Sequence, residues 1–220
     1  MTKNELWLKK TNAVFNGILL YSIAGVLHSI LDPIESLMSG LDTISSLGGG
    51  NVAGADGLSI FLYLLTAAII GGYVMFLLGL GGFAALLEGD DKAAVGKIRT
   101  GVLLGLAGEM ISLIPLIGWV IGGILNIIAF FLMMTGYSTL KNSPTFPAAA
   151  REGAGKLFTS QILLLIGVVL GWIPLIGGFF EGILDLIAFI LLLIGWSAIK
   201  NANPEASGIT PPPPPPVHRP

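Results

Sequence analysis

Six apolar stretches, each about as long as a lipid bilayer is thick, constrain this chain more than any other feature. They occupy residues 11–31, 58–87, 98–114, 119–140, 157–173 and 177–199. A stretch that crosses hydrocarbon needs its backbone polar groups paired internally, and an α-helix provides that pairing. The sequence therefore predicts an all-α membrane protein with six transmembrane helices.

The composition agrees with a chain whose surroundings are lipid. Hydrophobic residues make up 54% of the sequence and charged residues only 11%, whereas soluble domains carry about a quarter charged residues. The net charge is −2 without a basic patch, so we expect no nucleic-acid partner. The chain has no cysteine, which excludes thiolate chemistry and cysteine-based metal sites. We expect the lipid bilayer as its environment and no cofactor.

The basic residues set the predicted orientation. All 11 lysine and arginine residues lie in, or close to, the N-terminal arm, 88–97, 141–156 or 200–220. The connections on the other side contain none, although the long loop 32–57 carries four acidic residues. Because basic residues concentrate in cytoplasmic loops, we expect both termini in the cytoplasm. The first apolar run is about 20 residues long, which favours an uncleaved span over a signal peptide.

An internal repeat organises the second half of the chain. Residues 114–142 and 173–201 align without a gap at an offset of 59, with 16 identities in 29 positions. We interpret the third and fourth spans, and the fifth and sixth, as two copies of one helical hairpin. The first two spans form a divergent third copy. Because each unit has two spans, all units enter from the same side and are parallel repeats. The Ile-Pro-Leu-Ile-Gly run that begins each aligned segment predicts a tight turn.

These patterns predict five segments. They are a cytoplasmic N-terminal arm (1–10), a first, divergent hairpin unit (11–87) with an outer amphipathic insertion (32–57), a second hairpin unit (88–142), a third hairpin unit (143–200) and a disordered proline-rich cytoplasmic tail (201–220). In the insertion, Asp32 as N-cap and Pro33 at the first helical position predict a short surface helix. That helix either covers the bundle or docks a partner. The six prolines of the tail form either a solvated terminus or a ligand for a proline-reading domain.

Glycines four residues apart recur in the predicted spans and allow helix backbones to approach closely. The pairs are Gly101 and Gly105, Gly118 and Gly122, Gly167 and Gly171, and Gly178 and Gly182. Such faces pack either within the monomer or against a second copy or another membrane protein.

Four polar residues within the spans are the candidate functional residues: Glu109, Asn126, Glu181 and Asp185. Asp185 aligns with Asn126 in the repeat, and both are expected about 7–13 Å below the outer surface, as is Glu109. Carboxylates inside a membrane are a functional-site hypothesis by default. They are either structural hydrogen-bonding groups, a proton or monovalent-cation site, or the lining of a substrate path. We expect no catalytic or metal-binding residues.

The hairpin pattern resembles that of small multi-pass membrane proteins of prokaryotes, from families without an assigned activity. The run at 136–141, Gly-Tyr-Ser-Thr-Leu-Lys, and its copy at 195–200, Gly-Trp-Ser-Ala-Ile-Lys, carry the resemblance. It implies the plasma membrane of a bacterium or archaeon and carries over no functional residue. We therefore expect a non-enzymatic structural or accessory component of a membrane assembly. The alternative is a small transporter or channel with a proton or cation site at Glu109 and Asp185.

Overall fold

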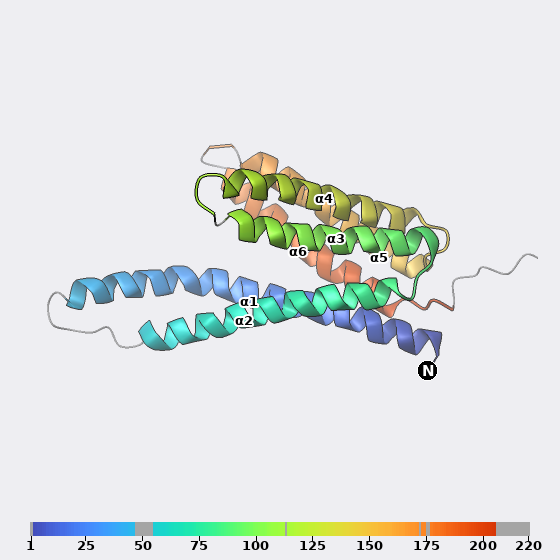
Figure 1. Ribbon diagram of the computed structural model, residues 1–220, viewed down its shortest axis with the longest axis horizontal. Helices are drawn as coiled ribbons and strands as arrows, with labels where there is room; N and C mark the ends of the chain where they lie inside the picture. Colours follow the sequence, from blue (N-terminus) through green and yellow to red (C-terminus); the bar gives the residue numbers. More distant parts are fainter. Residues whose placement is uncertain (1, 47–54, 113, 172, 175–176, 206–220) are drawn as a thin grey trace, which may run out of the picture. The chain divides into compact units, whose positions relative to one another are not determined.

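The computed structural model describes residues 2–46, 55–112, 114–171, 173–174 and 177–205, and within these ranges every regular element is an α-helix (Figure 1). The helices are α1 (Lys3–Ser46), α2 (Ala55–Ala84), α3 (Gly89–Ser112), α4 (Gly118–Asn142), α5 (Ala148–Gly171) and α6 (Gly177–Asn201). The predicted all-helical fold class is thereby confirmed.

Five of these helices contain segments long and apolar enough to cross a bilayer: Lys3–Met38, Gly57–Ala84, Gly118–Asn142, Ala148–Gly171 and Gly177–Asn201. They indicate an integral membrane protein. Helix α3 is not among the five, because Asp90, Asp91, Lys92, Lys97 and Arg99 all lie in its first half. The length of α3 is nevertheless close to that of α4 to α6.

The helix start predicted at Asp32 and Pro33 is wrong, because α1 continues through Pro33 to Ser46. A proline inside a helix removes one backbone hydrogen bond, whereas a break would leave several backbone groups without partners at each new end. The continuous helix is therefore the smaller loss in an apolar setting. Residues 47–54, the middle of the predicted insertion, lie outside the described residues.

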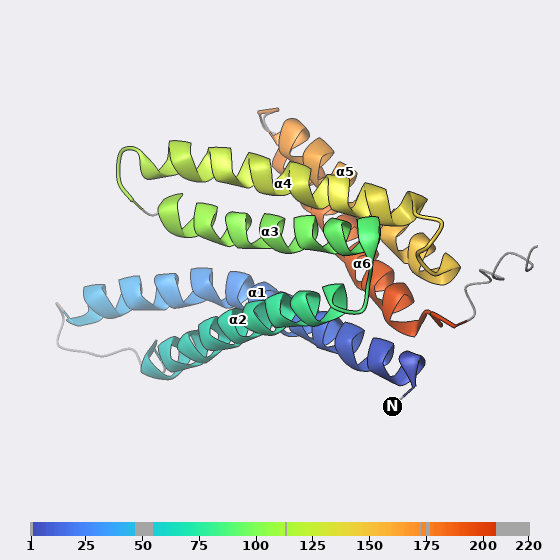
Figure 2. The ribbon, with the colours of Figure 1, turned by 45° about the vertical axis from the view of Figure 1, so that its right-hand side comes forward.

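The chain divides into two compact units, one of them Lys10–Phe83. In this unit α1 and α2 run antiparallel, and glycines bring their backbones together (Figure 2). A methyl group placed on Gly72 would lie 2.5 Å from the backbone nitrogen of Tyr21, and one on Gly79 would lie 2.6 Å from that of Val14. No side chain fits at either glycine while the helices keep this separation. The apolar side chains buried along this contact include Val14, Ile18, Phe76, Leu80 and Phe83.

The second unit comprises Met1–Lys9 and Ala84–Pro220. Within it α3 packs against α4, α5 against α6, and α4 also contacts α5. A methyl group on Gly136 would lie 2.8 Å from the carbonyl oxygen of Ala94, and one on Gly195 would lie 2.9 Å from that of Gly153. Both members of the first contact are therefore separated by 59 residues from their counterparts in the second.

Two further contacts follow the same offset. A methyl group on Gly101 would lie 2.8 Å from the carbonyl oxygen of Ala129. At the corresponding place in the second hairpin, Ser160 Oγ donates a hydrogen bond of 2.9 Å to the carbonyl oxygen of Ala188. The hydroxyl uses the carbonyl that the glycine leaves to direct backbone contact.

The connection from α3 to α4 is the tight turn that the sequence predicts. The backbone N–H of Gly118 donates to the Ile114 carbonyl at 3.0 Å, and the N–H of Gly177 donates to the Ile173 carbonyl at 2.9 Å. The turn is confirmed at 114–117, whereas residues 175–176 of the second turn lie outside the described residues.

Aromatic residues close the opposite end of the second unit, where α4 and α6 finish. The buried rings of Tyr137 and Trp196 meet edge to face, with centroids 6.5 Å apart. Trp7, near the start of α1, packs against Phe146 with ring centroids 6.0 Å apart, and its indole Nε1 donates a hydrogen bond of 2.9 Å to the Ile199 carbonyl. The first turns of α1 are thereby fixed against this end of the hairpins.

Replacing Gly72 by alanine is expected to lower the free energy of unfolding by about 1–3 kcal/mol, because the methyl group must push α1 and α2 apart. The neighbouring glycine provides a matched control, since a methyl group on Gly71 meets no atom within 4 Å. Gly71→Ala should be neutral or stabilise the helix by up to about 1 kcal/mol. Reversible unfolding in mixed micelles measures both variants, and equal effects would contradict this account of the contact.

Candidate functional site

The first predicted polar pair lies between α3 and α4. The side-chain amide of Asn126 donates a hydrogen bond of 2.9 Å from Nδ2 to Glu109 Oε1. The other amide atom, Oδ1, lies over the backbone of Gly108, where a methyl group would be only 2.7 Å away. A glycine at position 108 therefore makes the room that lets Asn126 turn toward Glu109.

The second pair lies between α5 and α6. Asp185 and Glu181 are one helical turn apart on α6, and both extend along glycines of α5. A methyl group on Gly167 would lie 3.4 Å from Asp185 Oδ1, and one on Gly171 would lie 2.8 Å from Glu181 Cδ. Gly167 and Asp185 stand 59 residues after Gly108 and Asn126, so a polar side chain rests on a glycine at corresponding places in both hairpins.

The chemistry of the two pairs differs. In the first hairpin an amide donor meets a carboxylate acceptor, so the pair satisfies itself. In the second hairpin two carboxylates share one glycine face, and the hydrogen bonds found among the described residues include none to Glu181 or Asp185. Both Glu109 and Asp185 are exposed on the surface of their hairpins. Within the described ranges, no three histidine, aspartate or glutamate side chains gather as a metal site.

Exchanging the two aligned residues tests whether these groups are structural. Asn126→Asp removes the donor and brings a second carboxylate toward Glu109, so the free energy of unfolding should fall by about 2 kcal/mol. Asp185→Asn removes a carboxylate that has no donor, so stability should rise by about 1 kcal/mol. Unfolding in mixed micelles measures both changes. A loss of stability in Asp185→Asn would show that the carboxylate holds a cation or a donor, contrary to the structural interpretation.

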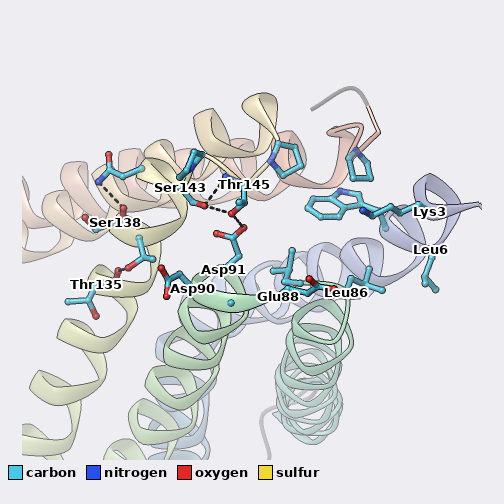
Figure 3. Close-up of a pocket in the computed structure, with 18 residues that line it drawn as sticks. Lys3, Leu6, Leu86, Glu88, Asp90, Asp91, Thr135, Ser138, Ser143 and Thr145 are labelled. Carbon is cyan, nitrogen blue, oxygen red and sulfur yellow. Dashed lines mark hydrogen bonds between the residues drawn. The ribbon is translucent and has the colours of Figure 1, made fainter. Parts of the chain in front are cut away.

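Sequence reasoning missed a cavity at the other end of the second unit (Figure 3). It has a volume of about 1190 Å³. Its walls come from the first turns of α1, the segment 86–91, the last two turns of α4, the connection 143–147 and Pro204. None of the four predicted intramembrane residues lines it.

Asp91 is the buried polar residue of this cavity, with only 4% of its surface exposed. Gly89, at φ +52°, begins α3 in the left-handed conformation that glycine adopts without strain. Figure 3 shows the Asp91 side chain directed from the start of α3 toward the connection 143–147. Thr145 Oγ1 donates a hydrogen bond of 2.7 Å to Asp91 Oδ2. Asp91 Oδ1 is buried and receives no hydrogen bond.

The hydrogen bonds around Asp91 have a defined direction. Ser143 Oγ and Thr145 Oγ1 are 2.9 Å apart, and the backbone N–H of Thr145 donates to Ser143 Oγ at 3.3 Å. A hydroxyl has one hydrogen to donate, and an ionised carboxylate only accepts. Since Thr145 gives its hydrogen to Asp91, Ser143 must donate to Thr145. The chain of donors thus ends on one oxygen of Asp91 and leaves the other free.

Asp91 and Thr145 are 54 residues apart in sequence, which explains why no local pattern reveals the cavity. The acidic residues of the segment 88–97 were considered only as part of a cytoplasmic connection. One signal was present: Asp90 and Asp91 begin an amphipathic segment rich in charge, next to a predicted span, where one carboxylate must face the protein.

Comparisons with protein-family models, with curated proteins and with solved structures found no match to this chain. The class that the fold defines is therefore the one its helices indicate, an integral α-helical membrane protein.

Proposed function

We propose that the chain crosses the membrane six times as three parallel hairpins, with both termini in the cytoplasm. The equal offset of 59 residues in the glycine contacts of α3–α4 and α5–α6 supports two copies of one hairpin. Because α5 and α6 are both apolar enough to cross a bilayer, the corresponding packing of α3 against α4 supports a crossing by α3 as well. The basic residues of α3 then lie at its cytoplasmic end.

The molecular role that we propose is that of a non-enzymatic structural or accessory component of a membrane assembly. One observation carries this proposal: Glu109 and Asp185 are exposed on hairpins whose helices are built to cross a bilayer. A carboxylate that faces hydrocarbon costs several kcal/mol, about 2.5–3.5 at the bilayer centre on insertion scales. A protein surface with hydrogen-bond donors removes that cost. We infer that the faces around Glu109 and Asp185 contact another protein.

The apolar surface beside these residues has the opposite character. Leu103 on α3 is 44% exposed and Ile187 on α6 is 42% exposed. Exposed aliphatic side chains at this depth are satisfied by lipid tails, so they give no reason for a protein contact. These two positions therefore serve as controls on the same helices.

A photoreactive amino acid placed at Glu109 or Asp185 should form a discrete adduct with a protein when membranes are irradiated in the cell. The same amino acid at Leu103 or Ile187 should form adducts with lipid alone. Gel electrophoresis detects the protein adducts, and mass spectrometry identifies the partner, including a second copy of this chain.

Lipid adducts at all four positions would contradict the proposed contact. That outcome would favour the alternative of a small transporter or channel, in which the carboxylates bind a proton or cation.

A further inference from the structure

The cavity that contains Asp91 has more negative than positive charge. Among its lining residues Glu88, Asp90 and Asp91 carry carboxylates, and Lys3 is the single lysine or arginine. Glu88 and Asp90 are exposed, whereas Asp91 is buried. The charge of the lining therefore favours a cationic ligand.

The cavity also presents acceptors where its own donors are already used. On α4, Thr135 Oγ1 donates to the Leu132 carbonyl at 3.0 Å and Thr139 Oγ1 donates to the Thr135 carbonyl at 2.9 Å. The amide of Asn142 donates to the Ser138 carbonyl at 2.9 Å. These side chains keep only their acceptor lone pairs for a ligand. A ligand that fits them must donate hydrogen bonds.

Asp91 provides an independent observation that points to a ligand. Its Oδ1 atom receives no hydrogen bond, although the side chain is more than nine-tenths buried and lines the cavity. A buried polar atom without a partner is costly, about 1–3 kcal/mol and more for a charged group. Thr145 and Ser143 hold the other oxygen and so orient the carboxylate. A donor that reaches Oδ1 completes this group.

The remaining walls are apolar and define the shape of the ligand. Leu6, Leu86, Leu87 and the prolines of the connection 143–147 lie beside the carboxylates. A volume of about 1190 Å³ is at the upper end of small-molecule sites. Aliphatic walls next to acceptors suit a flexible chain of methylenes that carries ammonium groups.

We propose that this cavity binds a linear aliphatic amine, with one ammonium group on Asp91 Oδ1 and others near Asp90 and Glu88. The Asp91 carboxylate, oriented by Thr145, is the specific anchor, and the exposed carboxylates supply attraction. This site is distinct from the membrane contacts of the hairpins, and it stands whether or not those contacts exist.

Titration calorimetry with spermidine on the full chain in phosphatidylcholine nanodiscs tests the proposal. The wild type is expected to bind one spermidine per chain. Asp91→Asn keeps an acceptor for Thr145 but removes the charge, and its affinity should fall about tenfold or more. Asp90→Asn removes the same charge from an exposed neighbour and should change the affinity by less than about threefold.

A second pair of variants fills the site without altering Asp91. Thr135→Lys places a tethered ammonium in the cavity and should abolish spermidine binding. Thr159 on α5 is the matched control, because it is also exposed and its hydroxyl donates to its own helix at the Gly155 carbonyl. Thr159→Lys should bind spermidine as the wild type does.

Three results would overturn the proposal. The first is the absence of spermidine binding to the wild type. The second is an equal loss of affinity within either pair of variants, which would indicate attraction to the surface charge alone. The third is displacement of spermidine by Mg²⁺ alone at equal concentration, which would indicate a metal site.

Discussion

Backbone contact at glycine is the interaction on which the rest of this structure depends. In lipid no hydrophobic effect drives apolar helices together, so close van der Waals packing must hold them. Gly72 on α2 meets the backbone of Tyr21, Gly136 on α4 meets that of Ala94, and Gly195 on α6 meets that of Gly153. The same device therefore joins the helices of each pair.

The glycine contacts also decide where polar groups are found. Asn126 and Asp185 both lie over a glycine of the preceding helix, which is the one residue that leaves room for a side-chain amide or carboxylate between the backbones. In one hairpin this position became a satisfied amide, bonded to Glu109. In the other it is a carboxylate beside Glu181, a difference that makes Asp185 the place where a partner or a cation has most to contribute.

Much of this could be predicted because membrane helices are specified by local patterns. Apolar length and helix-breaking turns need no knowledge of distant contacts, and the alignment of Asn126 with Asp185 follows from the repeat alone. The continuation of α1 through Pro33 could not be predicted, because capping signals describe a free helix end and not its competition with unpaired backbone groups. The cavity at Asp91 depends on Thr145 and Trp7, which only the folded chain brings to the same end of the hairpins.

The most direct test of the account is whether α3 crosses the membrane as α5 is proposed to do. Since the chain has no cysteine, single substitutions at the exposed positions Ala93, Ile117 and Ala148 each give a unique thiol. A membrane-impermeant maleimide should label Ile117→Cys in intact cells, and should label Ala93→Cys and Ala148→Cys only after permeabilisation. If the thiols at positions 93 and 117 reacted from the same side, α3 would not span the bilayer and the parallel hairpin arrangement would be wrong.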